Sequence, residues 1–215
     1  NISIYKIDIG IKFIKVLFIV ATASLFMTSC AVKEPKYGKN IKLPFAEISE
    51  NSDTSHTFYL VGDAGNADRE AGGNVLNILK EKLDKANSNS TLIFLGDNIY
   101  PSGLPEENHK ERKLAEQKLD VQMSVANDFK GKTIFIPGNH DWYSGGIKGV
   151  KRQEEYINAG LKQKKSFLPR NGCAIDKLNL SENLILITID SEWFLANWDK
   201  NPGINEDCDI KTREQ

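Results

Sequence analysis

Three short apolar runs in this chain each end in a loop of glycine and polar residues. The runs, each with a polar residue of the loop that follows, are 57–61 with Asp63, 92–95 with Asp97, and 133–136 with Asn139. Apolar runs of this length, bounded by turn-forming residues, are typical of strands covered on both faces, as in a parallel sheet. Asp97 lies 34 residues after Asp63 and 42 residues before Asn139, which leaves room for a helix in each interval. Since the carboxyl ends of parallel strands share one edge of a sheet, the pattern predicts that the three loops meet there.

Apolar residues at steps of three and four predict helices that pack against this sheet. The predicted buried stripes are Ala71, Val75, Ile78, Leu79, Leu83 and Ala86 in the first helix, Ala115, Leu119, Met123 and Ala126 in a helix over 106–129, and Val150, Ile157 and Leu161 in a third. Residues 184–189 form a fourth apolar run, which predicts another strand buried on both faces. This alternation of strands and helices predicts an α/β fold.

Length and charge narrow the class of protein. With 215 residues, of which 40% are hydrophobic, the chain is long enough for one sizeable core. The formal net charge is −1, and no basic cluster stands out beyond the N-terminal segment. We therefore expect one main domain and no nucleic-acid partner.

The N-terminal segment has the pattern of an export signal. Lys6, Lys12 and Lys15 precede an apolar run over 16–26, which is too short to span a membrane as a mature helix. The run closes in small residues before Cys30, which resembles the lipid-attachment site of bacterial lipoproteins, so we expect Cys30 to be lipidated. The alternative interpretations are a plain membrane anchor and a buried helix.

The export signal divides the chain into a lipoprotein signal peptide (1–29), a polar tether (30–55) and a folded domain (56–215). The protein would be exported and attached by lipid to a bacterial outer membrane, on its periplasmic face or at the cell surface. The other two cysteines, Cys173 and Cys208, would then fold where disulfides persist. We expect either a bridge between them or two free buried thiols. No sequence pattern predicts an oligomeric state.

The polar residues of the three loops are suited to metal binding. Asp63, Asp97, Tyr100 and Asn139 offer oxygen atoms, and His140 offers nitrogen. Two ions about 4 Å apart need a bridging ligand, which the Asp97 carboxylate in the middle loop can supply, and such a pair generates a hydroxide that attacks phosphorus in a phosphate ester. A Tyr100 phenolate favours a ferric ion, because free tyrosine titrates near ~10 and requires a strongly acidic cation. His140 could donate a proton to the leaving oxygen.

At these loops the sequence resembles the calcineurin-like metallophosphoesterases and, within them, the purple acid phosphatases. The resemblance covers about residues 56–190 and is carried by three ordered motifs, Gly62-Asp63-Ala64-Gly65, Gly96-Asp97-Asn98-Ile99-Tyr100 and Gly138-Asn139-His140-Asp141. Tyr100, three residues after the second aspartate, and Gly65, two residues after the first, are typical of the purple acid phosphatase branch. The resemblance implies a fold of two packed sheets flanked by helices.

The resemblance also implies a role for each loop residue. Asp63 and Tyr100 would bind a ferric ion, Asp97 would bridge, and Asn139 would bind a divalent ion, commonly iron, zinc or manganese. His140 would assist the leaving group. The substrate would be a phosphorylated small molecule.

The chain departs from this family in its histidines. Family members complete their metal sites with three further histidines in C-terminal motifs, whereas this sequence has only His56, His109 and His140. We therefore expect the chain to be the N-terminal part of a longer phosphatase, with little turnover of its own, or else a natural short form. The alternative function is a non-catalytic surface lipoprotein that uses the fold as a binding module.

Overall fold

The computed structural model describes residues 55–66, 73–196 and 207–215. The predicted signal peptide, Cys30 and all but the last residue of the predicted tether lie outside these ranges. Among the described residues, no helix combines the length and the apolar character that crossing a membrane requires.

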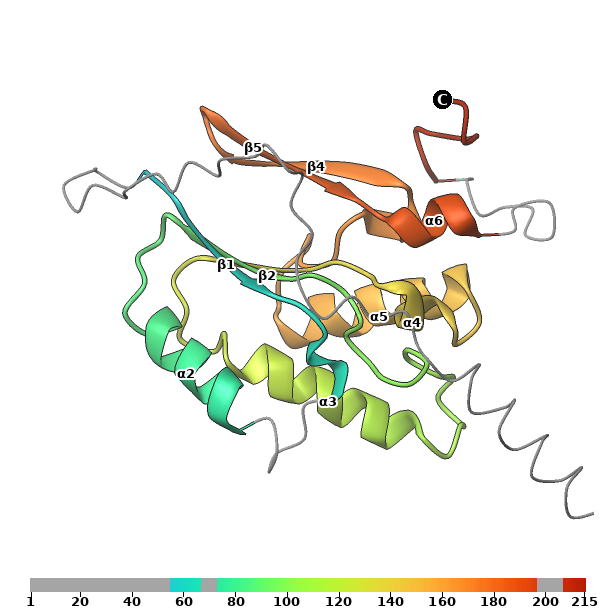
Figure 1. Ribbon diagram of the computed structural model, residues 1–215, viewed down its shortest axis with the longest axis horizontal. Coiled ribbons are helices and arrows are strands. Elements are labelled where there is room, and N and C mark those ends of the chain that lie inside the picture. Colours follow the sequence, from blue (N-terminus) through green and yellow to red (C-terminus); the bar gives the residue numbers. More distant parts are fainter. Residues whose placement is uncertain (1–54, 67–72, 197–206) are drawn as a thin grey trace, which may run out of the picture. The chain divides into compact units, whose positions relative to one another are not determined.

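Three parallel strands form the central sheet, which confirms the predicted α/β fold. They are β1 (Thr57–Val61), β2 (Ser90–Phe94) and β3 (Lys132–Phe135), and they lie side by side in that order. Helices α2 (Gly73–Leu83) and α3 (Arg112–Ser124) lie on one face of this sheet, and a hairpin of two further strands lies on the other (Figure 1). Because the strands run in one direction, their carboxyl ends form one edge, the carboxyl edge, and their amino ends form the opposite amino edge.

The residues of β2 are buried on both faces of the sheet, as predicted. Leu92 packs in the larger hydrophobic cluster, which includes Leu119 of α3. Ile93 points to the opposite face, where it packs in a smaller cluster that includes Leu178 of the hairpin. The continuous apolar run of β2 therefore reflects two covered faces.

The same prediction for β1 is wrong. Strand β1 lies at the side of the sheet, next to β2. It therefore exposes Phe58 and Leu60 by 40% and 59%.

The apolar stripe of α2 differs from the predicted one. Leu76, Leu79 and Leu83 are buried, whereas Val75 is 70% exposed and Ile78 is 54% exposed. The prediction for Val75 and Ile78 is wrong because helical steps fit more than one set of apolar residues. Contact with the sheet decides which set is buried.

Helices α3 and α5 bury the residues predicted at their centres. In α3, Ala115, Leu119 and Met123 are buried, and in α5 (Ile147–Gly160), Val150 and Ile157 are buried. The predicted first part of α3, over 106–111, forms turns instead. Those residues are polar and exposed, so no apolar stripe holds them in a helix against the core.

The prediction of a fourth strand buried on both faces is wrong. Residues 184–189 form β5 (Leu184–Ile189), which pairs with β4 (Ile175–Ser181) in a separate antiparallel hairpin. Ile185, Ile187 and Ile189 are each more than half exposed, because no described residue covers their face of the hairpin. An apolar run predicts a strand but does not show which of its faces is covered.

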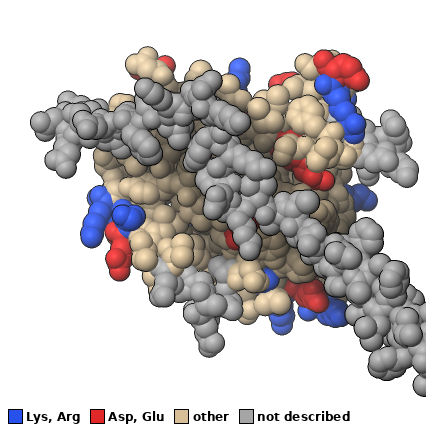
Figure 2. Space-filling view, viewed as in Figure 1, with Lys and Arg blue, Asp and Glu red and all other residues tan. Residues whose placement is uncertain are grey.

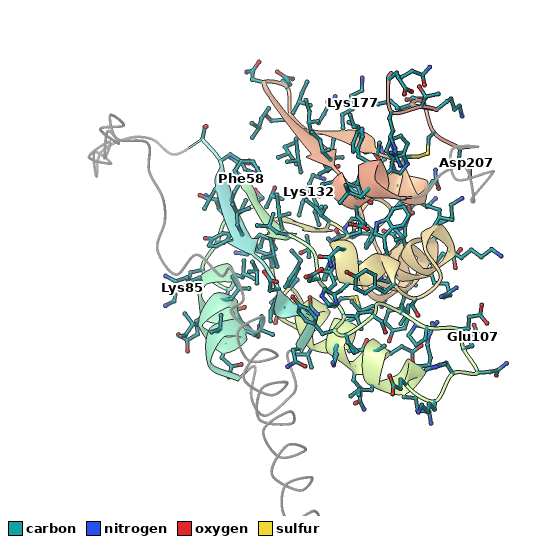
Figure 3. All side chains as sticks on the ribbon, turned by 45° about the vertical axis from the view of Figure 1, so that its right-hand side comes forward. Phe58, Lys85, Glu107, Lys132, Lys177 and Asp207 are labelled. Carbon is teal, nitrogen blue, oxygen red and sulfur yellow. A yellow bond between two sulfur atoms is a disulfide. The ribbon has the colours of Figure 1, made fainter. Side chains whose placement is uncertain are left out.

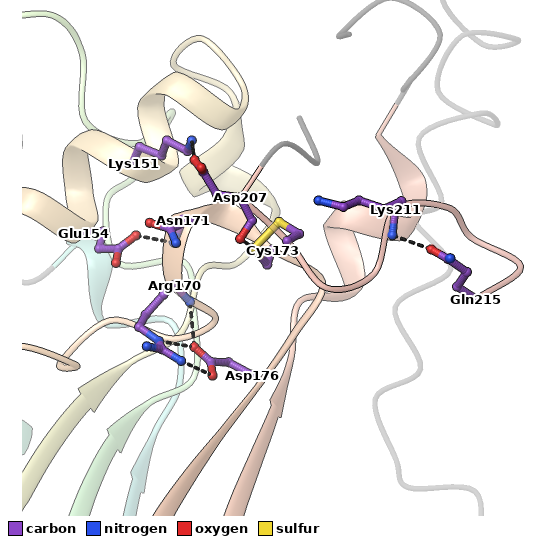
Figure 4. The surroundings of a disulfide bond; sticks show 10 residues. Lys151, Glu154, Arg170, Asn171, Cys173, Asp176, Asp207, Lys211 and Gln215 are labelled. Atoms are coloured by element: carbon purple, nitrogen blue, oxygen red, sulfur yellow. Dashed lines mark hydrogen bonds and ion pairs between the residues drawn. A yellow bond between two sulfur atoms is a disulfide. The ribbon is translucent and has the colours of Figure 1, made fainter. Parts of the chain in front are cut away.

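A disulfide joins the C-terminal segment to the start of the hairpin (Figure 4). It links Cys173 to Cys208, with 5.5 Å between the two Cα atoms. Lys151 also forms an ion pair with Asp207, with 3.1 Å between Nζ and Oδ2. Residues 207–215 are therefore attached to the domain by a covalent bond and by an ion pair.

Asp190 follows β5 directly and connects the helix after it to the short helix α4 (Asn139–Trp142). One of its carboxylate oxygens accepts hydrogen bonds from the N–H groups of Glu192 and Trp193 at the start of α6 (Ser191–Leu195). The other accepts a hydrogen bond from the indole N–H of Trp142 at 2.9 Å. Burial raises the pKa of Asp190 to about 7, although these three hydrogen bonds oppose the shift.

The raised pKa of Asp190 leads us to expect a loss of stability as the pH rises from about 4 to about 7. An aspartate in the unfolded chain titrates near ~3.9, so between the two pKa values the folded chain holds a proton that the unfolded chain has released. Unfolding then releases a proton, and the free energy of unfolding falls by up to about 1.4 kcal/mol per pH unit. Urea unfolding across this range measures the slope. Asp190→Asn should flatten it, and an equal slope in both proteins would contradict the assignment.

Candidate metal centre

The three predicted loops meet at the carboxyl edge and are hydrogen-bonded to one another. The first and second loops are joined by the N–H of Gly65, which donates to the carbonyl oxygen of Asp97 at 2.9 Å, and by the N–H of Tyr100, which donates to the carbonyl oxygen of Gly65 at 3.0 Å. The third loop is joined to the second by the N–H of His140, which donates to Asp97 Oδ1 at 3.1 Å. Asp97 therefore lies at the centre of the site, as the middle position of β2 requires.

Two glycines permit this close approach of the loops. A Cβ atom at Gly65 would overlap the carbonyl oxygen of Asp97, and a Cβ atom at Gly138 would overlap Asp97 Oδ1. Any side chain at either position would push the loops apart. Gly65 of the first motif and Gly138 of the third are thus explained by the second loop, which packs against both, whereas nothing crowds Gly62.

Both aspartates adopt a left-handed backbone conformation. The angle φ is 56° at Asp63 and 52° at Asp97. Most side chains meet steric strain in this region, and aspartate is one of the few that tolerate it. Strained residues of this kind concentrate at functional sites, so their occurrence at the ends of two adjacent strands supports a ligand site here.

The hydroxyl of Tyr100 lies between the two carboxylates. It is 2.7 Å from Asp63 Oδ1 and 2.8 Å from Asp97 Oδ2. The hydrogen bond to Asp63, followed by burial and the hydrogen bond to Asp97, raises the pKa of Tyr100 above its usual value. Three side-chain oxygen atoms from two loops therefore converge on one point.

Asn139 faces the same region from the third loop. An open cavity of about 660 Å³ is lined in part by Asp63, Asp97, Asn139 and Tyr143. The side-chain amide of Asn139 donates a hydrogen bond to the Tyr143 hydroxyl at 2.5 Å. The structure thus places all four predicted metal ligands, including Tyr100, at one edge of the sheet.

The imidazole of His140 is held beside this cluster by two aromatic rings. Its centroid lies 4.5 Å from that of Tyr100 and 4.9 Å from that of Tyr143. Its Nδ1 lies 2.5 Å from the carbonyl oxygen of Pro101. Because a carbonyl oxygen only accepts, Nδ1 carries a proton and Nε2 remains for another partner.

Asp141 connects the second and third loops, although sequence reasoning assigned it no role. Its buried carboxylate accepts hydrogen bonds from the backbone N–H groups of Gly138, Asn98 and Ile99, at 2.8, 3.1 and 3.2 Å. It also accepts one from the side-chain amide of Asn98 at 3.1 Å. Burial raises the pKa of Asp141 to about 6, although the backbone hydrogen bonds oppose the shift. Asp141 therefore positions the loops, and its place in the third motif is its main sequence signal.

The family model of the calcineurin-like phosphoesterases matches residues 56–214, which include all three loops. The chain belongs to the calcineurin-like phosphoesterase family. This confirms the family that the three motifs predicted. A comparison with curated proteins found no significant match. Calcineurin-like phosphoesterases act on phosphoesters and typically bind two metal ions.

The donor atoms at this edge fit the metal chemistry of a calcineurin-like phosphoesterase. Carboxylate and phenolate oxygens are ligands for hard cations such as Fe³⁺, and Asp63, Asp97 and Tyr100 supply them in contact with one another. In the part of the chain that the structure describes, no three His, Cys, Asp or Glu side chains gather to hold a metal ion. Beside the carboxylates of Asp63 and Asp97, the loops offer the hydroxyl of Tyr100 and the side-chain amide of Asn139 as further oxygen donors.

Proposed function

We propose that this chain is a dinuclear metallophosphoesterase of the purple acid phosphatase-like branch. The observation that carries this proposal is the Tyr100 hydroxyl, which is 2.7 Å from an oxygen of Asp63 and 2.8 Å from an oxygen of Asp97. A phenol between two carboxylates suits a ferric ion, because Fe³⁺ is acidic enough to replace the phenol proton near neutral pH. Family membership supports the hydrolysis of phosphoesters in general, and Tyr100 supports the branch.

Each loop residue has one task in this proposal. Asp97 would be shared by two ions, Asp63 and Tyr100 would hold the ferric ion, and Asn139 would hold a divalent ion, which would be iron, zinc or manganese. When bound, the two ions supply Lewis-acid activation of water and of the phosphoryl oxygens. In its doubly protonated form, with the Nδ1–H held by the Pro101 carbonyl oxygen, His140 would donate the proton on Nε2 to the leaving oxygen of a phosphorylated small molecule.

We also propose that the enzyme is exported and attached through a lipid on Cys30 to a bacterial outer membrane. The support is the sequence pattern of residues 1–30, in which lysines precede an apolar run and small residues precede the cysteine. The disulfide between Cys173 and Cys208 gives independent support, because such bonds persist in oxidising compartments.

The direct test is metal content and visible absorbance together with activity on a generic aryl phosphate. We expect the iron-loaded protein to show a charge-transfer band from Tyr100 to Fe³⁺, and Tyr100→Phe should abolish it. Tyr143→Phe is the matched control, because Tyr143 and Tyr100 line one hollow and the change removes a hydroxyl there without removing a proposed ligand. An unchanged band in Tyr100→Phe would refute ferric ligation and leave the family chemistry intact.

The placement of the histidines favours a second candidate function. His56 Nε2 lies 3.0 Å from Thr91 Oγ1 at the amino edge, and His109 is exposed, with its Nδ1 3.2 Å from the N–H of Glu111. Of the three histidines, only His140 belongs to the loops at the carboxyl edge. So few nitrogen ligands favour a surface lipoprotein that uses the fold as a binding module. If neither this chain nor one extended through the downstream reading frame holds two metals or cleaves the ester, the binding module is the better assignment.

A further inference from the structure

A second hollow lies at the amino edge of the central sheet, opposite the candidate metal centre. It has a volume of about 450 Å³ and is lined by Lys130, Lys132, Lys164 and Lys165. Lys130 and Lys132 lead into β3, which begins at Lys132. Lys164 and Lys165 lead into residues 166–168, which run parallel to β3 and hydrogen-bond with it. Two segments that are distant in sequence therefore bring their lysines to the same edge.

These four lysines have no counter-charge in the described ranges. All four side chains are exposed, and none of their ammonium groups forms a hydrogen bond or an ion pair with another described residue. A side-chain acceptor near them, Asn158 Oδ1, takes the backbone N–H of Lys165 at 3.4 Å and carries no charge. Asp128, an acid close to Lys130 in sequence, lies 3.7 Å from Lys80 instead. Like charges gathered in this way repel one another, and anions between them would relieve that repulsion.

The lysine cluster is a local feature and does not follow from composition. The formal net charge of the whole chain is −1. On the face shown in Figure 2, basic and acidic side chains of the described residues are mixed. A concentrated positive surface on a nearly neutral protein indicates a partner that carries concentrated negative charge.

The chain enters the folded domain at this same edge. Strand β1 begins at Thr57, and Phe58, Thr91 and Lys132 form one row across the sheet (Figure 3). Cys30, the proposed lipid attachment site, precedes Thr57 by 27 residues. The proposed membrane attachment therefore leads to the edge that carries the lysines.

We propose that Lys130, Lys132, Lys164 and Lys165 form a basic surface that docks on the anionic headgroups of the membrane to which the chain is attached. This inference rests on the lipid anchor proposed above. The hollow is open, and lysines are point charges on long stems, so the surface suits an array of phosphate headgroups better than a single bidentate ligand. Docking there turns the carboxyl edge, with its candidate metal centre, toward the solution.

The test compares binding of the full chain to two kinds of vesicle, measured by flotation. One kind contains phosphatidylcholine alone, and the other also contains phosphatidylglycerol. The test variant carries Lys132→Glu, Lys164→Glu and Lys165→Glu. The matched control carries Lys110→Glu, Lys113→Glu and Lys148→Glu, which change the net charge equally at exposed positions away from the hollow. Binding to the neutral vesicles measures the anchoring segment alone. A failure of the proposed lipid anchor would therefore appear as a loss of binding to neutral vesicles, separately from any loss of preference for anionic ones.

We expect the test variant to lose its preference for anionic vesicles by about 100-fold, since each lysine at an anionic surface changes partition by roughly fivefold. The control variant should keep that preference, and salt should weaken it in the unmodified protein. Equal losses in both variants would overturn the proposal in favour of diffuse attraction, and no loss in either would overturn it outright. Displacement by inorganic phosphate, but not by chloride at equal ionic strength, would overturn it in favour of a discrete phosphate site.

Discussion

Asp97→Asn is expected to abolish the binding of a second metal ion and to lower hydrolysis of an aryl phosphate by at least about 100-fold. The carboxylate of Asp97 accepts hydrogen bonds from the Tyr100 hydroxyl and from the N–H of His140, one through each oxygen, so it links the second loop to the third at the centre of the site. Asparagine tolerates the left-handed backbone of this position, which means that the change removes charge without forcing the loop to rearrange. Metal content per chain is the primary measurement.

Asp84→Asn is the control for this prediction, because Asp84 lies on the surface and pairs with Lys80. It should leave both metal content and hydrolysis unchanged. Retention of two metal ions per chain in Asp97→Asn would show that Asp97 does not bridge.

Asp141→Ala is expected to lower the free energy of unfolding by about 3–5 kcal/mol. The change would leave the buried N–H groups of Gly138, Asn98 and Ile99 without an acceptor, and each unpaired buried group costs about 1–3 kcal/mol. Because the same hydrogen bonds hold the second loop against the third, metal affinity should also fall, by about 10–100-fold. Urea unfolding and metal titration measure the two effects.

Asp141→Asn separates the loss of hydrogen bonds from the loss of charge. It retains one acceptor oxygen, so its free energy of unfolding should lie between that of the wild type and that of Asp141→Ala. Wild-type stability and metal affinity in Asp141→Ala would show that other contacts hold the loops together.

Sequence patterns predicted the central sheet and the edge at which the site lies. A strand buried on both faces requires an unbroken apolar run, and a carboxylate directly after the run marks the point where the strand leaves the core. Asp63, Asp97 and Asn139 each follow such a run, so their convergence depended only on the strands being parallel. The structure confirms that arrangement.

Sequence patterns failed where burial depends on a partner that is distant in the chain. Val75 and Ile78 match a helical stripe as well as Leu76 does, but only Leu76 is buried. Ile187 lies in an apolar run like that of β2, yet it is 63% exposed because β5 joins a separate hairpin. Periodicity records how side chains are directed along an element, whereas burial depends on what packs against it.

The sequence by itself thus determined the family, the parallel strands and the polar loops, because each of these is encoded in contiguous residues. Only the tertiary structure decided that Asp141 holds the loops together and that lysines around 130 and 164 form one basic surface. The hydrogen bonds of Asp141 and the meeting of these lysines join segments that lie far apart in the chain. Such contacts depend on the folded path of the backbone and leave no periodic or local signal in the residues themselves.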